Sequence, residues 1–67
     1  MRNLNKRQIN FIKAWFKRMW TGIGSVCTVD QMTQTEQNKL QAMNDHETLW
    51  QNADRLINDL ALEEMYN

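Results

Sequence analysis

The sequence of 67 residues contains no proline, two glycines and one cysteine. Without proline, no position removes a backbone donor from a helix. A single cysteine, Cys27, excludes a disulfide within the chain, and with it the class of small secreted proteins that depend on disulfides. A reducing, cytoplasmic location is therefore the simpler expectation, and an intermolecular Cys27–Cys27 bridge is the exception to it.

Long hydrophobic runs are also missing. The longest stretch without a formal charge is 19–29, and it contains Thr, Gly and Ser, whereas a membrane span needs about 20 mostly apolar residues. Lys13, Lys17 and Arg18 interrupt the one apolar segment that resembles a secretory signal. We therefore expect neither a transmembrane helix nor a secretory signal.

The chain has no net charge, but its charges are divided between its two halves. Residues 1–29 carry six basic side chains and no acid, and residues 30–67 carry all eight acids and two bases. Zero net charge argues against a general nucleic-acid binder. The opposite signs of the halves indicate separate roles for them or attraction between them.

The first half predicts one amphipathic helix over about 4–21. At about 100° per residue, its apolar side chains cover an arc of about 180°, wider than the stripe of about 100° that a surface helix needs. We expect the helix to end in a glycine-containing turn over 22–28, because Gly22 or Gly24 can adopt the left-handed conformation of a C-cap. The apolar arc consists of Leu4, Ile9, Phe11, Ile12, Trp15, Phe16, Met19 and Trp20.

The second half predicts a long or kinked helical region over about 30–65. Met43, Trp50 and Ile57 recur at seven-residue spacing, as in heptad packing. This phase continues past Asn44, which favours one helix, straight or kinked, over two. Capping boxes offer three helix starts, namely Thr28 with Gln31, Thr33 with Glu36, and Asn44 with Glu47.

These elements predict an all-α single domain over 1–67, either a helical hairpin or a small three-helix arrangement, complete by itself or through oligomerisation. The many Asn and Gln side chains are interpreted as a neutral solvated surface. The acids near the end of the chain oppose the helix dipole, so we expect them to meet a basic partner such as the first helix. These acids are Asp59, Glu63 and Glu64.

The sequence contains no convincing catalytic or metal-binding pattern. His46 lies between Asp45 and Glu47, but adjacent helical residues point about 100° apart and do not orient one ring together. One His and one Cys do not supply the three or four ligands that zinc requires, and Gly22-x-Gly24 lacks the context of a phosphate-binding loop. We expect a non-enzymatic protein without metal or cofactor, in which His46 is a half-buried packing residue.

The wide apolar arc predicts protein binding. One partner helix covers one stripe, so part of the arc should stay exposed, and exposed apolar patches mark interaction sites. We predict a small regulator, inhibitor or adaptor that binds a larger protein or a second copy of itself. This short, Asn/Gln-rich, proline-free composition resembles that of small bacteriophage accessory proteins, which bind and redirect a host protein. The expected contact residues, rich in the tryptophan typical of hot spots, are Phe11, Trp15, Met19, Trp20 and Trp50.

Nucleic-acid binding is the alternative. The first helix carries a basic face with no acid nearby, as tracking a phosphate backbone requires. Its aromatic residues lie opposite the charges, whereas base stacking requires them to be interleaved with the charges. The same pattern is typical of helices that lie on membrane surfaces, which we rank below both. The candidate nucleic-acid-binding residues are Lys6, Arg7, Lys13, Lys17 and Arg18.

Overall fold

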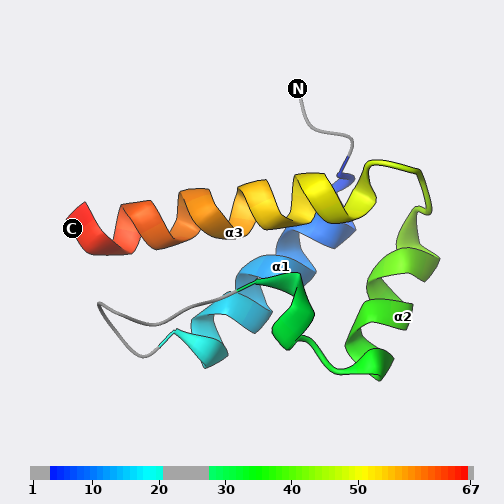
Figure 1. Cartoon of the computed structure of the whole chain (residues 1–67), viewed down its shortest axis with the longest axis horizontal. Helices are drawn as coiled ribbons and strands as arrows, with labels where there is room; N and C mark the ends of the chain where they lie inside the picture. The colour runs from blue at the N-terminus through cyan, green and yellow to red at the C-terminus, as the bar shows by residue number, and fades with distance from the viewer. Residues whose placement is uncertain (1–3, 21–27, 67) are drawn as a thin grey trace.

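A computed structural model describes residues 4–20 and 28–66. It contains helix α1 (Lys6–Met19), a short 3-10 helix η1 (Val29–Gln31), helix α2 (Gln34–Met43) and helix α3 (Leu49–Tyr66). In Figure 1, α3 lies along the long axis of the molecule, α1 runs diagonally across it, and α2 stands at the end where α3 begins. The described chain is all-α and forms the small three-helix arrangement, one of the two predicted architectures.

Helix α1 begins at a capping box that the sequence analysis did not use. The Asn5 side chain accepts a hydrogen bond from the Gln8 backbone N–H at 2.8 Å, and the Gln8 side-chain oxygen accepts one from the Asn5 N–H at 3.1 Å. Helix α1 ends at Met19, with Lys17 and Arg18 in its last turn, where the dipole favours positive charge. The predicted turn with Gly22, Gly24 and Cys27 lies outside the described residues.

Two of the predicted capping boxes start the next elements. The Gln31 side chain accepts a hydrogen bond from the Thr28 N–H at 3.0 Å and opens η1, which is one 3-10 turn and not an α-helix. Thr33 and Glu36 exchange hydrogen bonds of 2.8 and 3.1 Å and open α2. These reciprocal bonds satisfy donors that every helix start leaves unpaired.

The preference for one continuous helix beyond Thr33 is wrong, because α2 ends at Met43 and α3 begins at Leu49. The reason is visible in Leu40 and Leu49, which are nine positions apart. On a straight helix they would lie about half a turn from each other, on opposite faces. Both side chains are fully buried in one core, which the chain achieves by turning between them, so that α2 stands across the start of α3 (Figure 1).

The core draws apolar side chains from all four elements, so the wide arc of α1 is covered from several sides. We expected some of the large side chains of this arc to stay exposed. Instead Leu4 and Trp15 are buried, while Phe11 and Trp20 are half-buried. The buried core consists of Leu4, Ile12, Trp15, Phe16, Val29, Met32, Leu40, Leu49, Ala53, Leu56 and Ile57.

A polar junction joins the start of α1 to the end of α2. Gln8 is fully buried, and its side-chain amide donates to the carbonyl oxygens of Leu40 at 2.9 Å and Asn44 at 3.0 Å. The Asn5 amide donates to the Met43 carbonyl at 3.2 Å. The last carbonyls of a helix have no partner inside it, so α1 supplies donors to the end of α2. The interpretation of these two amides as solvated surface is therefore wrong.

Other polar contacts hold η1 against both later helices. The Val29 N–H donates to the Asp54 side chain on α3 at 2.9 Å. The Gln37 amide on α2 donates to the carbonyl oxygens of Val29 at 3.3 Å and Met32 at 3.1 Å. These bonds fix the apolar side chains of Val29 and Met32 in the core, where both are buried.

Candidate protein-binding surfaces

The structure separates the residues predicted to contact a protein. Trp15 is 1% exposed and belongs to the core, so it is not available to a partner of the folded chain. Phe11, Trp20 and Trp50 are half-buried, and Met19 is 41% exposed. The wide arc of α1 thus serves mainly to build the core, because α2, α3 and η1 together cover more of it than one helix would.

Phe11 and Trp20 do not form one patch. They are nine positions apart on the chain, which places them about half a turn from each other around α1. The Trp20 ring instead stacks on Phe16, with ring centroids 5.3 Å apart and an angle of 22° between the planes. Aromatic pairs in this range stabilise each other beyond simple burial, so Trp20 is anchored on the Phe16 side of the helix.

A hollow of about 270 Å³ lies between α1 and α3. Its apolar base is formed by Phe16, which is buried, and Leu60, which is half-buried. Its rims carry opposite charges, basic on α1 and acidic on α3. We call it the α1–α3 hollow, and its lining residues are Lys13, Phe16, Lys17, Leu60, Glu63 and Glu64.

Two of the three terminal acids lie beside the first helix, as expected, while Asp59 lines a different hollow on α3. Glu63 and Glu64 line the same hollow as Lys13 and Lys17. Within the described part of the chain, the one ion pair is made elsewhere, by Arg18. The charges across the hollow are therefore neighbours without direct pairing among the described residues.

An exposed apolar ridge runs along the last turns of α3. Leu62 is 42% exposed, Met65 46% and Tyr66 83%. Their spacing of three and four positions puts them on one face of the helix, about half a turn away from the core-facing Leu60. We call these three residues the α3 ridge.

Acidic side chains flank the α3 ridge. Asp59 and Glu63 line a shallow hollow together with Leu62 and Tyr66. None of the predicted contact residues lies in this ridge, because the apolar stripe evident in the sequence is the one that faces the core. The available signal was a second apolar spacing at 62, 65 and 66, out of phase with that stripe.

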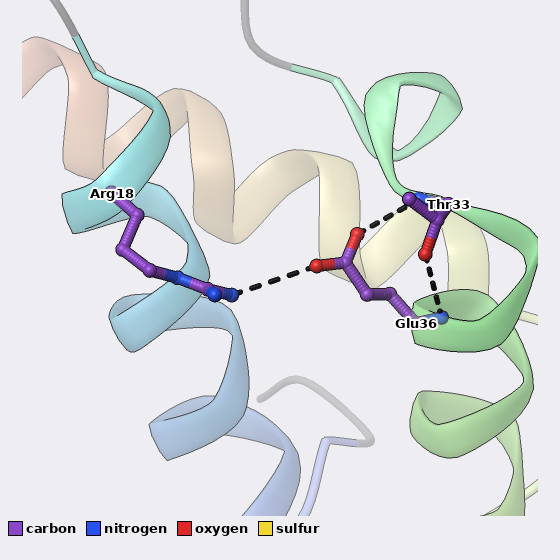
Figure 2. Close-up of polar contacts among 3 residues, drawn as sticks. All are labelled: Arg18, Thr33 and Glu36. Carbon is purple, nitrogen blue, oxygen red and sulfur yellow. Dashed lines mark hydrogen bonds and ion pairs between the residues drawn. The ribbon is translucent and has the colours of Figure 1, made fainter.

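The five predicted nucleic-acid-binding side chains of α1 are all exposed. Arg18 reaches α2, where its Nη2 lies 3.5 Å from Glu36 Oε2, and Figure 2 shows that Glu36 also holds Thr33 in the capping box. Arg7 lines a separate hollow of about 300 Å³ beside Lys39 of α2. The basic face is thus a solvated surface with one pairing to the acidic half.

His46 is half-buried in the segment between α2 and α3, with its Nδ1 3.2 Å from the Thr48 hydroxyl. No group of three or more His, Cys, Asp or Glu side chains in the described ranges is arranged to hold a metal ion. Among the same residues, no helix has both the length and the apolar character of a membrane span.

Comparisons with known proteins identify no relative. No protein-family model, no curated protein sequence and no solved structure matches the chain. The exposed surfaces of the chain therefore carry the evidence for its function.

Proposed function

We propose that this chain is a small non-enzymatic protein-binding module, a regulator, inhibitor or adaptor, that docks on a larger protein through the α3 ridge. The observation that carries the proposal is the exposure of Leu62, Met65 and Tyr66 on one face of one helix. A helix with anchors at such spacing is the recognition element that fits a hydrophobic groove on a partner. Tyr is also among the residue types enriched at binding hot spots.

The charges beside the ridge define the chemistry of the partner. Asp59 and Glu63 flank Leu62 and Tyr66, so a complementary groove is apolar at its base and basic at its rim. Charge complementarity of this kind raises the association rate and selects among partners.

Capture experiments with matched variants test the proposal. The tagged chain, exposed to a lysate of its own source cells, should retain a protein that mass spectrometry identifies. The double variant Leu62→Ser, Met65→Ser should bind that purified protein at least about tenfold more weakly. The control Arg55→Ser, Asn58→Ser changes exposed residues earlier on the same outer face of α3 and should bind like the original chain.

Two results would contradict this function. Equal affinity of the ridge variant and the control would place the contact elsewhere on the molecule. Failure of the original chain to retain any protein would remove the basis for a regulator. Circular dichroism of both variants establishes that their helices are intact.

Nucleic-acid binding is the second candidate, favoured by the exposure of all five basic side chains of α1. Binding driven by phosphate contacts falls steeply between about 50 and 200 mM salt. Fluorescence anisotropy with labelled duplex DNA and single-stranded RNA at both salt concentrations measures this directly. Protein binding as the main function predicts no specific nucleic-acid complex at the higher salt concentration, and a tight complex there would promote the second candidate.

A further inference from the structure

We infer that the α1–α3 hollow is the contact surface between two copies of this chain, related by a two-fold axis that runs along the hollow. This inference is independent of the proposed function, which uses the α3 ridge. Leu60 in the hollow and Leu62 in the ridge point about 200° apart around α3. A second copy seated in the hollow therefore leaves Leu62, Met65 and Tyr66 free for another protein, and Glu63 is the one residue that lines both this hollow and the one beside the ridge.

The charges of the hollow are self-complementary under a two-fold rotation. Lys13 and Lys17 form one rim, and Glu63 and Glu64 form the other. When a second copy is rotated by 180° about an axis along the hollow, its acidic rim lies over the basic rim of the first copy. Its basic rim then lies over the acidic rim of the first copy. In an isologous interface the same patch meets itself, so a patch of one charge sign repels its copy, whereas this one attracts it.

The four rim charges are available for this contact. The ion pair of the described chain uses Arg18 and Glu36 and none of the rim residues. Between the rims, half-buried Leu60 supplies the accessible apolar surface, while Phe16 beneath it is only 5% exposed and belongs to the core. Half-buried Trp20 stacks on Phe16. An apolar centre with a charged rim is the common anatomy of protein interfaces.

The whole molecule also permits association with itself. The formal net charge is zero, so two copies have no long-range repulsion to overcome. A standard interface takes about 800 Å² from each partner, roughly one sixth of the 4741 Å² surface of the chain.

Sedimentation equilibrium of the full chain over a concentration series tests the inference through charge reversal. The original chain should sediment at twice its monomer mass of 8.0 kDa. The variant Lys13→Glu, Lys17→Glu has two acidic rims, and the variant Glu63→Lys, Glu64→Lys has two basic rims. Each alone should dimerise at least about tenfold more weakly, because like charges now oppose each other.

An equal mixture of the two variants is the decisive sample. An acidic hollow now faces a basic one, so the mixture should recover the dimer. Recovery also shows that both variants are folded. The matched control Arg7→Glu, Lys39→Glu makes the same change in net charge at a different hollow and should dimerise like the original chain.

The inference is overturned by an original chain that stays monomeric throughout the series, by a mixture that stays monomeric, or by a control that loses the dimer equally. The ridge variant Leu62→Ser, Met65→Ser should dimerise normally, and its loss of the dimer would also count against the hollow. Failure of the dimer leaves capture through the ridge unaffected, so the two proposals fail separately.

Discussion

Gln8 shows how one polar side chain determines the packing of two helices. Among the described residues it is the fully buried polar side chain, and its amide oxygen and nitrogen both have partners. A buried amide without partners costs free energy, whereas a paired one is tolerated and directs the geometry around it. Gln8 therefore occupies a core position that an apolar residue would fill without capping α2.

Replacing this amide should destabilise the fold. In Gln8→Ala the carbonyl of Leu40 loses the donor that Gln8 supplies, and we expect the free energy of unfolding to fall by about 2–3 kcal/mol. Urea denaturation followed by circular dichroism measures the change. Gln51→Ala, on the exposed face of α3, is the control and should stay within about 0.5 kcal/mol. Equal effects of both substitutions would contradict the role of the junction.

Trp15 should behave as a core residue and not as a contact residue. Trp15→Ala removes a side chain that is 1% exposed, at a cost of about 3–5 kcal/mol, which is most of the stability expected of so small a domain. Met19→Ala, at an exposed position in the same last turns of α1, should cost less than about 1 kcal/mol. Thermal unfolding compares them, and a stable Trp15→Ala variant would show that the core is built differently.

At the scale of elements, two of the three predicted helix starts are confirmed, whereas the third is wrong, because Asn44 caps the end of α2 and α3 begins at Leu49. The turn of the chain between α2 and α3 was not predicted either. The boxes at Thr28 and Thr33 open η1 and α2 because each depends on residues three positions apart. The break after Met43 escaped detection because the seven-residue repeat of apolar residues continues in phase across the turn between α2 and α3. The sequence signal for this break was the nine-residue spacing of Leu40 and Leu49, which would put them on opposite faces of a continuous helix.

The contribution of the α2 capping box to stability can be measured separately from that of the Arg18–Glu36 ion pair. Thr33→Ala removes the side-chain acceptor of the Glu36 N–H and should cost about 1 kcal/mol. Glu36→Gln keeps an acceptor for the Thr33 N–H but removes the charge that faces Arg18, whose side chain is 67% exposed. An exposed pair contributes little, so this loss should stay within about 0.5 kcal/mol in urea titrations. A larger loss for Glu36→Gln than for Thr33→Ala would reverse this ranking.

The candidate surfaces were less predictable than the helices. Helical periodicity identified the apolar arc of α1, but whether an arc becomes core or contact surface depends on how many elements pack on it. Trp15 became core because the turn over 44–48 allows α2 and α3 to contribute separately to the core. The hollow beside Phe16 required knowledge of which parts of α1 and α3 are adjacent, which no local pattern contains.

At the scale of the whole molecule, one core is shared by α1, η1, α2 and α3. None of the helices buries its apolar side chains without the others, and the junction at Gln8 ties α1 to α2. Small domains with a single core usually unfold in one cooperative step.

The chain should therefore unfold as one unit. Tryptophan fluorescence reports mainly on the surroundings of Trp15 in α1, Trp20 directly after α1 and Trp50 in α3. Far-ultraviolet circular dichroism reports on all helices. The two denaturation curves should have the same midpoint. Separate midpoints would show that part of the helical structure melts independently of the core.

The donors that α1 extends to the end of α2 also constrain how these helices can move. Apolar contacts between helices tolerate small relative shifts, because their attraction depends little on direction. Hydrogen bonds, by contrast, weaken steeply when their angle departs from linearity. The side-chain amides of Asn5 and Gln8 therefore fix the start of α1 relative to the end of α2. Substitution of one apolar core residue by another should have little effect on the angle between α1 and α2. A shift of the Asn5–Gln8 pair by a single position along the sequence would break the hydrogen bonds that hold this angle.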